Sequence, residues 1–152
     1  MHSRIFQVSM EPIEEENYIC EAEYCDHWFT REIANYVSDD CDRDGDIKRL
    51  ANIAKGYSVG EDDNGEYIII TNKEEYFSYA YVKFMEALNK IGKPTLEEFT
   101  NRISLWNLDQ AVEDQFGFYV DADGELMTFD AFIRRCAINE KYYIGGTIDY
   151  NF

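Results

Sequence analysis

Two segments near the N-terminus alternate apolar with polar residues, the pattern of strands that bury one face. Arg4–Ser9 and Asn17–Tyr24 are therefore expected to be strands joined by an acidic connection. From His27 the apolar spacing becomes helical. We expect two short helices, one on each side of the aspartate-rich segment Ser38–Asp46, with Gly56 closing the second.

The middle of the chain predicts a hairpin followed by a longer helix. Tyr57–Val59 and Glu66–Thr71 are expected to pair around Asp63-Asn64-Gly65, because Asn-Gly readily adopts the positive φ angles of a tight turn. In Phe77–Ile91 apolar residues then recur every three or four positions. Aromatic residues at this spacing, such as Phe77, Tyr81 and Phe84, are more often core than binding surface, so no binding role is expected for them.

Gly92 and Pro94 stop this helical pattern. The chain is expected to form one continuous domain over residues 1–152, and this turn is where a sub-domain boundary would fall, although a turn between two helices explains it equally well. Thr95 and Glu98 have the form of a capping box that begins another short helix. One more helix is expected at Leu108–Phe116.

The C-terminal part predicts a strand at Gly117–Val120, a turn at Asp121–Glu125 and a helix capped by Thr128. A last strand is expected in Tyr142–Tyr150, with Gly145-Gly146 as a hairpin turn. Helices and strands do not alternate regularly. The expected fold class is therefore α+β, with small mixed sheets and hairpins and several short helices in an elongated acidic protein.

Composition supports a folded chain: 45% of the 152 residues are hydrophobic and 16% are aromatic. No apolar run approaches the roughly 18 residues of a membrane span, and the N-terminus lacks the pattern of a signal peptide, so a cytoplasmic protein is expected. The cysteines have no framework spacing and are expected to be reduced thiols. They are Cys20, Cys25, Cys41 and Cys136.

The formal net charge of −17 is concentrated in four stretches of the chain. These stretches hold 25 of the 31 acidic residues and two basic ones, for a net charge of −23, whereas the other 91 residues carry +6. They are Glu11–Asp26, Asp39–Asp46, Glu61–Glu75 and Asp109–Asp130. Such crowding costs folding stability and exceeds what solubility requires, so it indicates a positively charged partner.

One acidic segment has the beginning of a calcium-binding loop. Asp40–Ala51 places acids at loop positions 1, 3 and 5 (Asp40, Asp42 and Asp44) and glycine at position 6. Position 12, which should supply a bidentate carboxylate, is an alanine. The alternative is that Asp44 or Asp46 caps the helix that follows.

The sequence contains few residues suited to a zinc site or to catalysis. Cys20, Cys25 and His27 resemble half of a zinc site that Cys41 could complete, and buried thiols are the simpler alternative. With two histidines, no G-x-S-x-G elbow and no phosphate-binding glycine loop, no enzymatic activity and no cofactor are expected.

Two motifs between residues 76 and 150 carry a family resemblance. Pro94–Phe116 contains two short acidic helical segments, and Asp130–Ile138 leads through a turn to the glycine-containing Tyr142–Ile148. In this order and spacing the chain resembles the ArdA-type antirestriction proteins. These are small acidic proteins of mobile elements that imitate DNA in the binding groove of type I restriction–modification enzymes, often as elongated homodimers. The resemblance implies that activity, and a homodimer, for this chain.

The charge gives a separate reason for the same hypothesis. Duplex DNA presents one negative charge per about 1.7 Å of axis, and a protein with carboxylates fixed at similar spacing can compete for its partners. We therefore expect an acidic DNA-mimic inhibitor of a restriction–modification or CRISPR system, which binds a positively charged DNA-binding protein and neither nucleic acid nor membrane. The carboxylates expected to face this partner are Asp62, Asp63, Glu66, Glu74, Glu75, Glu97, Glu98, Asp109, Glu113, Asp114, Asp121 and Asp123.

Two alternatives come from the same residues. An immunity protein, or another acidic inhibitor of one basic toxin or nuclease, would use charge for fast association and a few aromatic anchors for affinity. A calcium-binding helix–loop–helix module would instead depend on Asp40–Ala51.

Overall fold

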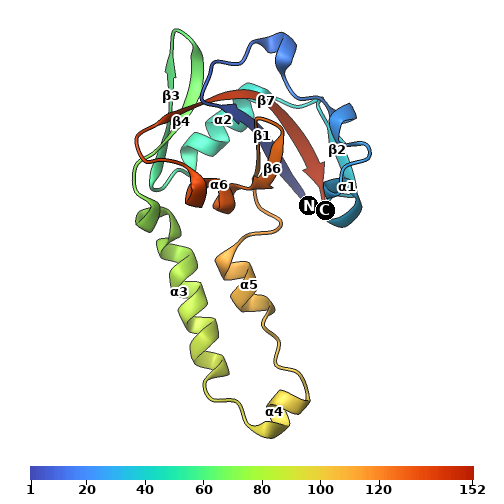
Figure 1. Ribbon diagram of the computed structural model, residues 1–152, viewed down its shortest axis with the longest axis vertical. Helices are drawn as coiled ribbons and strands as arrows, with labels where there is room; N and C mark the ends of the chain where they lie inside the picture. Colours follow the sequence, from blue (N-terminus) through green and yellow to red (C-terminus); the bar gives the residue numbers. More distant parts are fainter.

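The last strand, β7 (Lys141–Asn151), organises a single seven-stranded sheet in the computed structural model, which describes residues 1–152 (Figure 1). It pairs antiparallel with β4 near its beginning, with β1 along most of its length and with β2 at its end. The strand order is β3-β4-β7-β1-β5-β6, in which only β1 and β5 run parallel. The other strands are β1 (His2–Ser9), β2 (Tyr36–Ser38), β3 (Tyr57–Asp62), β4 (Gly65–Ile70), β5 (Tyr119–Ala122) and β6 (Glu125–Thr128).

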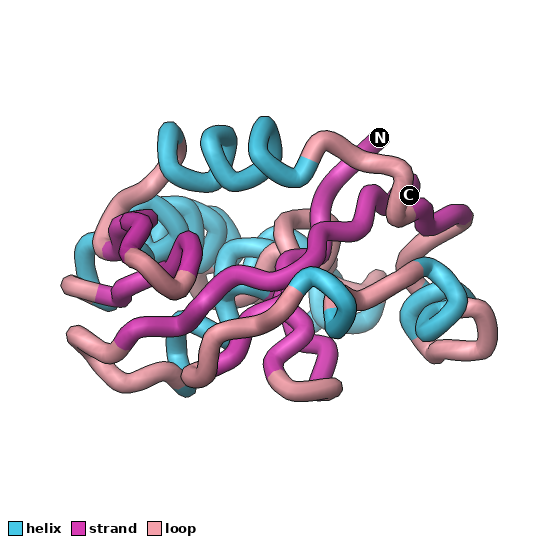
Figure 2. The backbone as a smooth tube through the Cα atoms, turned by 90° about the horizontal axis from the view of Figure 1, so that it is seen from above, coloured by secondary structure: helices cyan, strands magenta, loops and turns pink.

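Helical segments cover the sheet and extend from it. Two short 3-10 helices, η1 (Glu15–Asn17) and η2 (Glu21–Tyr24), follow β1, and the α-helices are α1 (Phe29–Glu32), α2 (Arg43–Asn52), α3 (Lys73–Ile91), α4 (Leu96–Thr100), α5 (Trp106–Val112) and α6 (Phe129–Arg135). Viewed from above, the two chain ends lie side by side (Figure 2). The Phe152 N–H donates to the Met1 carbonyl oxygen at 3.0 Å.

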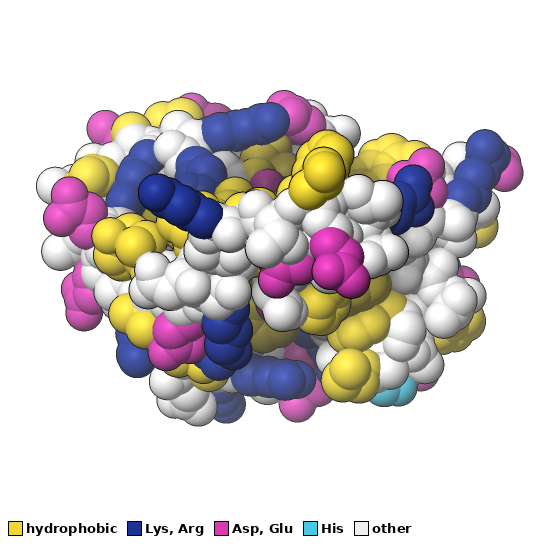
Figure 3. Space-filling model, turned by 90° about the horizontal axis from the view of Figure 1, so that it is seen from below, with side chains coloured by type: hydrophobic (Ala, Val, Ile, Leu, Met, Phe, Trp, Pro, Cys, Tyr) yellow, Lys and Arg dark blue, Asp and Glu magenta, His cyan; other side chains and the backbone are white.

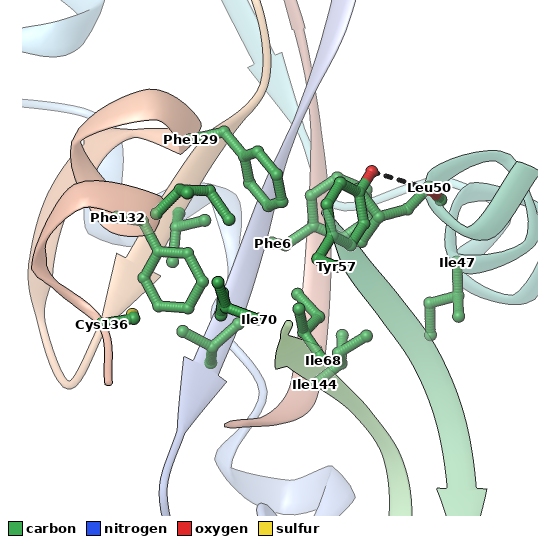
Figure 4. Packing of buried hydrophobic residues seen from close by; sticks show 13 residues of the cluster. Phe6, Ile47, Leu50, Tyr57, Ile68, Ile70, Phe129, Phe132, Cys136 and Ile144 are labelled. Atoms are coloured by element: carbon green, nitrogen blue, oxygen red, sulfur yellow. Dashed lines mark hydrogen bonds between the residues drawn. The ribbon is translucent and has the colours of Figure 1, made fainter. Parts of the chain in front are cut away.

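The two faces of the sheet carry separate hydrophobic clusters. Adjacent residues of β1 point to opposite faces, so that Ile5 packs with Tyr24, Phe29 and Tyr150 on one side. Phe6 joins the larger cluster on the other side, where α2 and α6 supply Leu50, Phe129 and Phe132 (Figure 4). In this cluster the buried Tyr57 hydroxyl donates to the Leu50 carbonyl oxygen at 3.0 Å.

A β-bulge lies where β7 crosses the middle of β1. Phe6 pairs with Thr147 and Val8 with Ile144, so Gly145 and Gly146 together oppose the single residue Gln7. The Gln7 side-chain oxygen accepts from Gly146 N at 2.9 Å and from Ile19 N at 3.1 Å, which ties the segment before η2 to the bulge. The extra residue also reverses the alternation of β7, so Ile144 and Ile148 belong to different clusters.

The α+β class is confirmed, and the hairpin at Asp63-Asn64, the capping box at Thr95 and the cap at Thr128 lie where the sequence predicts them. One large sheet replaces the expected small ones. Asn17–Tyr24 is not a strand but the region of η1 and η2, and the helix expected from His27 is shortened to α1 because the chain then pairs with β7 as β2. The expected turn at Gly145-Gly146 is the bulge, and β6 was not predicted.

Helices α3, α4 and α5 form an arm that projects from the sheet, with α4 at its far end (Figure 1). None of the residues in these three helices is buried. Of the aromatic residues interpreted as core, Phe77 packs against the larger cluster, whereas 63% of Tyr81 is exposed. The turn Gly92–Pro94 lies between α3 and α4.

We predict that Gly146→Ala destabilises the fold by about 1–3 kcal/mol, because the new methyl group overpacks the bulge. A Cβ at this position would lie 2.9 Å from Tyr18 Cβ and 3.1 Å from Ile19 N, which leaves little room for a shift. Urea denaturation measures the change. Ser58→Ala on the exposed face of β3 is the control, and equal stability of the two variants would contradict the role of the bulge.

Candidate functional site

Arg43, the first residue of α2, is the point at which three acidic segments meet. Its Nε donates to the Gly145 carbonyl oxygen at 2.7 Å, and one terminal nitrogen donates to the Ile144 carbonyl oxygen and to Glu66 Oε2, both at 2.9 Å. The guanidinium also lies 5.2 Å from the centre of the Tyr18 ring. One cation therefore joins the residues after η1, the hairpin β3–β4 and the strand β7.

This junction gathers acidic residues that are far apart in sequence. The residues before Tyr18 include Glu14–Glu16, and the Glu21 N–H donates to Asp39 Oδ2 at 3.1 Å. In the hairpin, Glu61 lies directly opposite Glu66. Like charges in that arrangement repel each other and weaken the pairing of the two strands. The ion pair between Arg43 and Glu66 offsets part of this repulsion.

We define the acidic face as ten exposed carboxylates on these segments. In Figure 1 the blue segment after β1 and the tip of the β3–β4 hairpin lie at the end of the molecule opposite α4. The ten residues are Glu14, Glu15, Glu16, Glu21, Asp39, Asp40, Asp42, Asp44, Glu61 and Asp63. Positively charged side chains of a partner can reach this face without moving the fold.

Few carboxylates are neutralised within the chain. Only seven of the 31 acidic residues lie within 4.0 Å of a basic group, and all other acids lack an ion pair. The seven are Asp26, Asp44, Asp46, Asp62, Glu66, Glu125 and Asp149. The negative charge inferred from composition is therefore largely uncompensated at the surface.

Three of the predicted partner-binding residues lie on the hairpin at the acidic face. Asp63 is exposed in the turn. Asp62 accepts from Lys141 Nζ at 2.5 Å and from the Tyr143 hydroxyl at 3.1 Å, and the hydrogen bond from Lys141 lowers the pKa of this carboxyl. Glu66 is held by Arg43, which lowers its pKa in the same way. Asp62 and Glu66 thus help to hold the face together.

The structure does not bring the other predicted residues to this face. Glu74 and Glu75 begin α3, whereas Glu97 and Glu98 lie in α4 at the far end of the arm (Figure 1). Three more are exposed: Asp109 lies on α5 in the arm, and Glu113 and Asp114 follow that helix. The twelve residues are therefore spread along the whole molecule and form no single surface.

The prediction that Asp121 faces a partner is wrong, because only 8% of this residue is exposed. Its carboxylate accepts from the buried Tyr24 hydroxyl at 2.9 Å and from Gly124 N at 2.9 Å. Burial, and then the charge of Asp121, raise the pKa of Tyr24, so the hydroxyl remains a donor. Asp121 therefore holds the β5–β6 turn against η2, while Asp123 in that turn is exposed.

The calcium loop does not form. Residues from Arg43 onward are helical, and the Asp42 side chain caps α2 by accepting from Gly45 N at 3.0 Å. Asp46 is buried and accepts from Arg4 Nε at 2.7 Å, so neither Asp44 nor Asp46 is the cap. Ligands on a helix of this kind cannot converge as a twelve-residue loop requires.

The half-site for zinc is not assembled either. His27 Nδ1 accepts from Phe29 N at 3.3 Å, and Cys41 Sγ lies 3.1 Å from Thr147 O. No group of three or more His, Cys, Asp or Glu side chains is placed to hold a metal ion. All four cysteines are unpaired thiols.

No protein-family model matches the chain, and no curated protein or solved structure is significantly similar to it. The interpretation of the acidic face therefore depends on its own chemistry. None of the helices combines the length and apolar character needed to cross a membrane.

Sequence reasoning selected only Asp63 from the acidic face. A signal for the rest was present, because Glu11–Asp26 holds seven acidic residues and no basic one. Of these residues, the expected strand Asn17–Tyr24 includes Glu21, which lies instead in η2. Glu14–Glu16 were expected in the acidic connection before that strand, and they lie exposed at η1. The convergence with Asp39–Asp44 could not be predicted, since it depends on contacts of Arg43 with strands more than twenty residues away.

We predict that Arg43→Met lowers the free energy of unfolding by about 2–4 kcal/mol near pH 7, because it leaves two carbonyl oxygens and Glu66 without their donor. Lys48→Met removes the same charge from an exposed position of α2 and should change stability by about 0.5 kcal/mol or less. Chemical denaturation of both variants measures the difference.

The difference in unfolding free energy between Arg43→Met and Lys48→Met should depend on pH. A carboxyl whose pKa is lowered in the native state stabilises that state above its unfolded pKa, about 4.3 for glutamate, and the contribution is lost as the pH falls through the native value. The gap between Arg43→Met and Lys48→Met should therefore narrow in acid. A gap that stayed constant would assign the whole effect to the carbonyl contacts.

Proposed function

We propose that this protein is an acidic DNA-mimic inhibitor of a nucleic-acid-binding defence system of the restriction–modification or CRISPR type. In this proposal the acidic face takes the place of DNA on a positively charged DNA-binding protein. The single observation that carries the proposal is that three separate segments, which carry exposed and mostly unpaired carboxylates, meet at Arg43.

The fixed backbone of the face supports mimicry in particular. Its carboxylates lie on or beside η1, at the first residue of η2, on the loop that leads into α2 and at the β3–β4 hairpin, and contacts of Arg43 and Gln7 join these segments. A partner that grips DNA places Lys and Arg along a row of phosphates. Carboxylates held by a rigid fold can meet such a row without the entropy cost of ordering a flexible acidic tail.

The charge also fixes the expected kinetics and salt dependence. A surface with a strong single-sign field speeds association with an oppositely charged groove, and salt weakens the attraction. Binding by mimicry should therefore weaken steeply as salt rises and should be prevented by duplex DNA occupying the same groove. No activity on a substrate enters this proposal.

The test measures DNA cleavage by a purified type I restriction enzyme and by a Cas9-type effector, with and without the protein. The triple variant Glu14→Gln, Glu15→Gln and Glu16→Gln removes three charges from the acidic face. We expect its inhibition constant to rise by about tenfold, because the variant loses three exposed ion pairs with the partner, each of modest strength.

A matched control removes three charges elsewhere, through Glu86→Gln, Glu97→Gln and Asp109→Asn on the arm. This control should inhibit as the unmodified protein does, within about twofold. Equal losses in both variants would show that only net charge matters. Inhibition of neither enzyme, or inhibition that ignored salt and competitor DNA, would contradict the proposal and favour an inhibitor of one basic toxin.

A further inference from the structure

A cavity of about 390 Å³ lies at the root of the arm, where α3 leaves the sheet and the chain returns after α5. Most of its lining residues are hydrophobic, as is typical of sites that bind small molecules. Four aromatic residues from separate segments line it: Tyr57 of β3, Tyr76 of α3, Phe118 before β5 and Phe129 of α6. The Tyr57 and Phe129 rings, drawn in Figure 4, have centroids 5.3 Å apart.

Hydrogen bonds and ring contacts hold this aromatic wall in place. The Tyr76 hydroxyl donates to Asp130 Oδ1 at 2.7 Å, and the Phe129 N–H donates to the Phe118 carbonyl oxygen at 2.8 Å. The Tyr76 ring centroid lies 6.0 Å from that of Tyr57 and 5.9 Å from that of Phe129. A ligand therefore meets walls that are already ordered, and its affinity is not spent on ordering them.

Two carboxylates line the same cavity and have no cation beside them. Asp130 accepts one hydrogen bond on each oxygen, from the Tyr76 hydroxyl and from the Asp114 N–H, both at 2.7 Å. Neither Asp114 nor Asp130 lies within 4.0 Å of a basic group. Lys55, the basic residue of the lining, is exposed and has no ion pair either. Two carboxylates and one lysine give the lining a formal charge of −1.

The arm itself contributes little charge near this cavity. Lys73–Val112, from the start of α3 to the end of α5, holds six acidic and five basic residues, a net charge of −1 out of −17. Seen from the end of the arm, hydrophobic and basic side chains lie among a few acidic ones (Figure 3). The groove between α3 and α5 that borders the cavity contains Lys83 and Lys90 as well as Glu86. A cation is therefore drawn to the carboxylates at the root rather than along the arm.

We infer that this cavity binds a small organic cation in which a protonated amine is attached to an aromatic or other apolar group. The aromatic rings pack against the apolar part, and their faces also attract positive charge. A carboxylate has about four acceptor positions, so Asp130 can accept from an ammonium group in addition to its two present donors. The inference does not depend on the proposed function, since the cavity and the acidic face share no residue.

Two kinds of molecule carry this chemistry, and Lys55 distinguishes them. A simple amine leaves Lys55 without a partner, whereas an amino acid also brings a carboxylate with which this lysine can pair. Phenethylammonium and phenylalanine share the ring and the ammonium group and differ in that carboxylate. Tighter binding of phenylalanine, lost in Lys55→Met, would assign the site to amino acids. Tighter binding of phenethylammonium would assign it to simple amines.

NMR titration of the full chain, labelled with nitrogen-15, tests the inference with these two probes and with 3-phenylpropionate, which has a carboxylate in place of the ammonium group. At least one ammonium probe should bind with a dissociation constant of about 1 mM or below, and 3-phenylpropionate at least about tenfold more weakly. Asp114→Asn and Asp130→Asn should each weaken the ammonium probe by about fivefold to tenfold. The control Asp123→Asn removes the same charge from an exposed turn outside the cavity and should change binding by less than about twofold.

A second variant tests the cavity without removing a hydrogen bond. Ala80 of α3 lines the cavity, and Ala80→Leu fills part of it, so binding of the ammonium probe should weaken by at least about tenfold. Val82→Leu enlarges an exposed side chain of the same helix outside the cavity and should have no effect. Circular dichroism checks that each variant folds.

Three results would overturn the inference: no binding of either ammonium probe, equal binding of 3-phenylpropionate, or binding that Ala80→Leu leaves unchanged. Inhibition of DNA cleavage in Ala80→Leu is measured alongside. Loss of ligand binding with inhibition kept, or the reverse in the triple variant of Glu14–Glu16, separates this inference from the proposed function.

Discussion

Repulsion between like charges is the constraint on which the rest of this structure depends. A chain of net charge −17 can fold only if most carboxylates stay in water and the few cations are used where acidic segments must approach one another. Arg43 is used in this way at the β7 bulge, and Arg4 lies between Asp46 and Asp149 beneath α2. Both side chains are mostly buried, so their interactions are little screened by salt.

The parts of the fold that the sequence predicted are those specified by neighbouring residues. The hairpin at Asp63-Asn64, the Thr95 capping box and the long helix α3 each follow from residues close together in sequence. The parts that were missed depend on distant partners. Gln7 accepts from the N–H of Ile19, between η1 and η2, and the buried carboxylate of Asp121 accepts from the Tyr24 hydroxyl nearly one hundred residues away in sequence.

In the candidate site, too, some features follow from neighbouring residues and others depend on contacts between distant ones. Composition located the acidic stretches, but a list of carboxylates in sequence order could not say which ones share a surface. The resemblance of residues 76–150 to acidic helix pairs drew attention to Glu97 and Glu98, which lie at the tip of a nearly neutral arm. Charge and apolar surface are thus separated at the two ends of the molecule, and each end suits a different kind of contact.

The position of β7 beside β1 has a consequence for how the molecule forms. These two central strands stand at opposite ends of the chain, with pairs such as Ile5 and Ile148 more than 140 residues apart in sequence. Contacts between such distant residues are slow to form because a long loop must close first. Until β7 arrives, the Gln7 and Arg43 contacts that it supplies are missing. The acidic face is therefore assembled last, and folding should be slow and dependent on completion of the final strand.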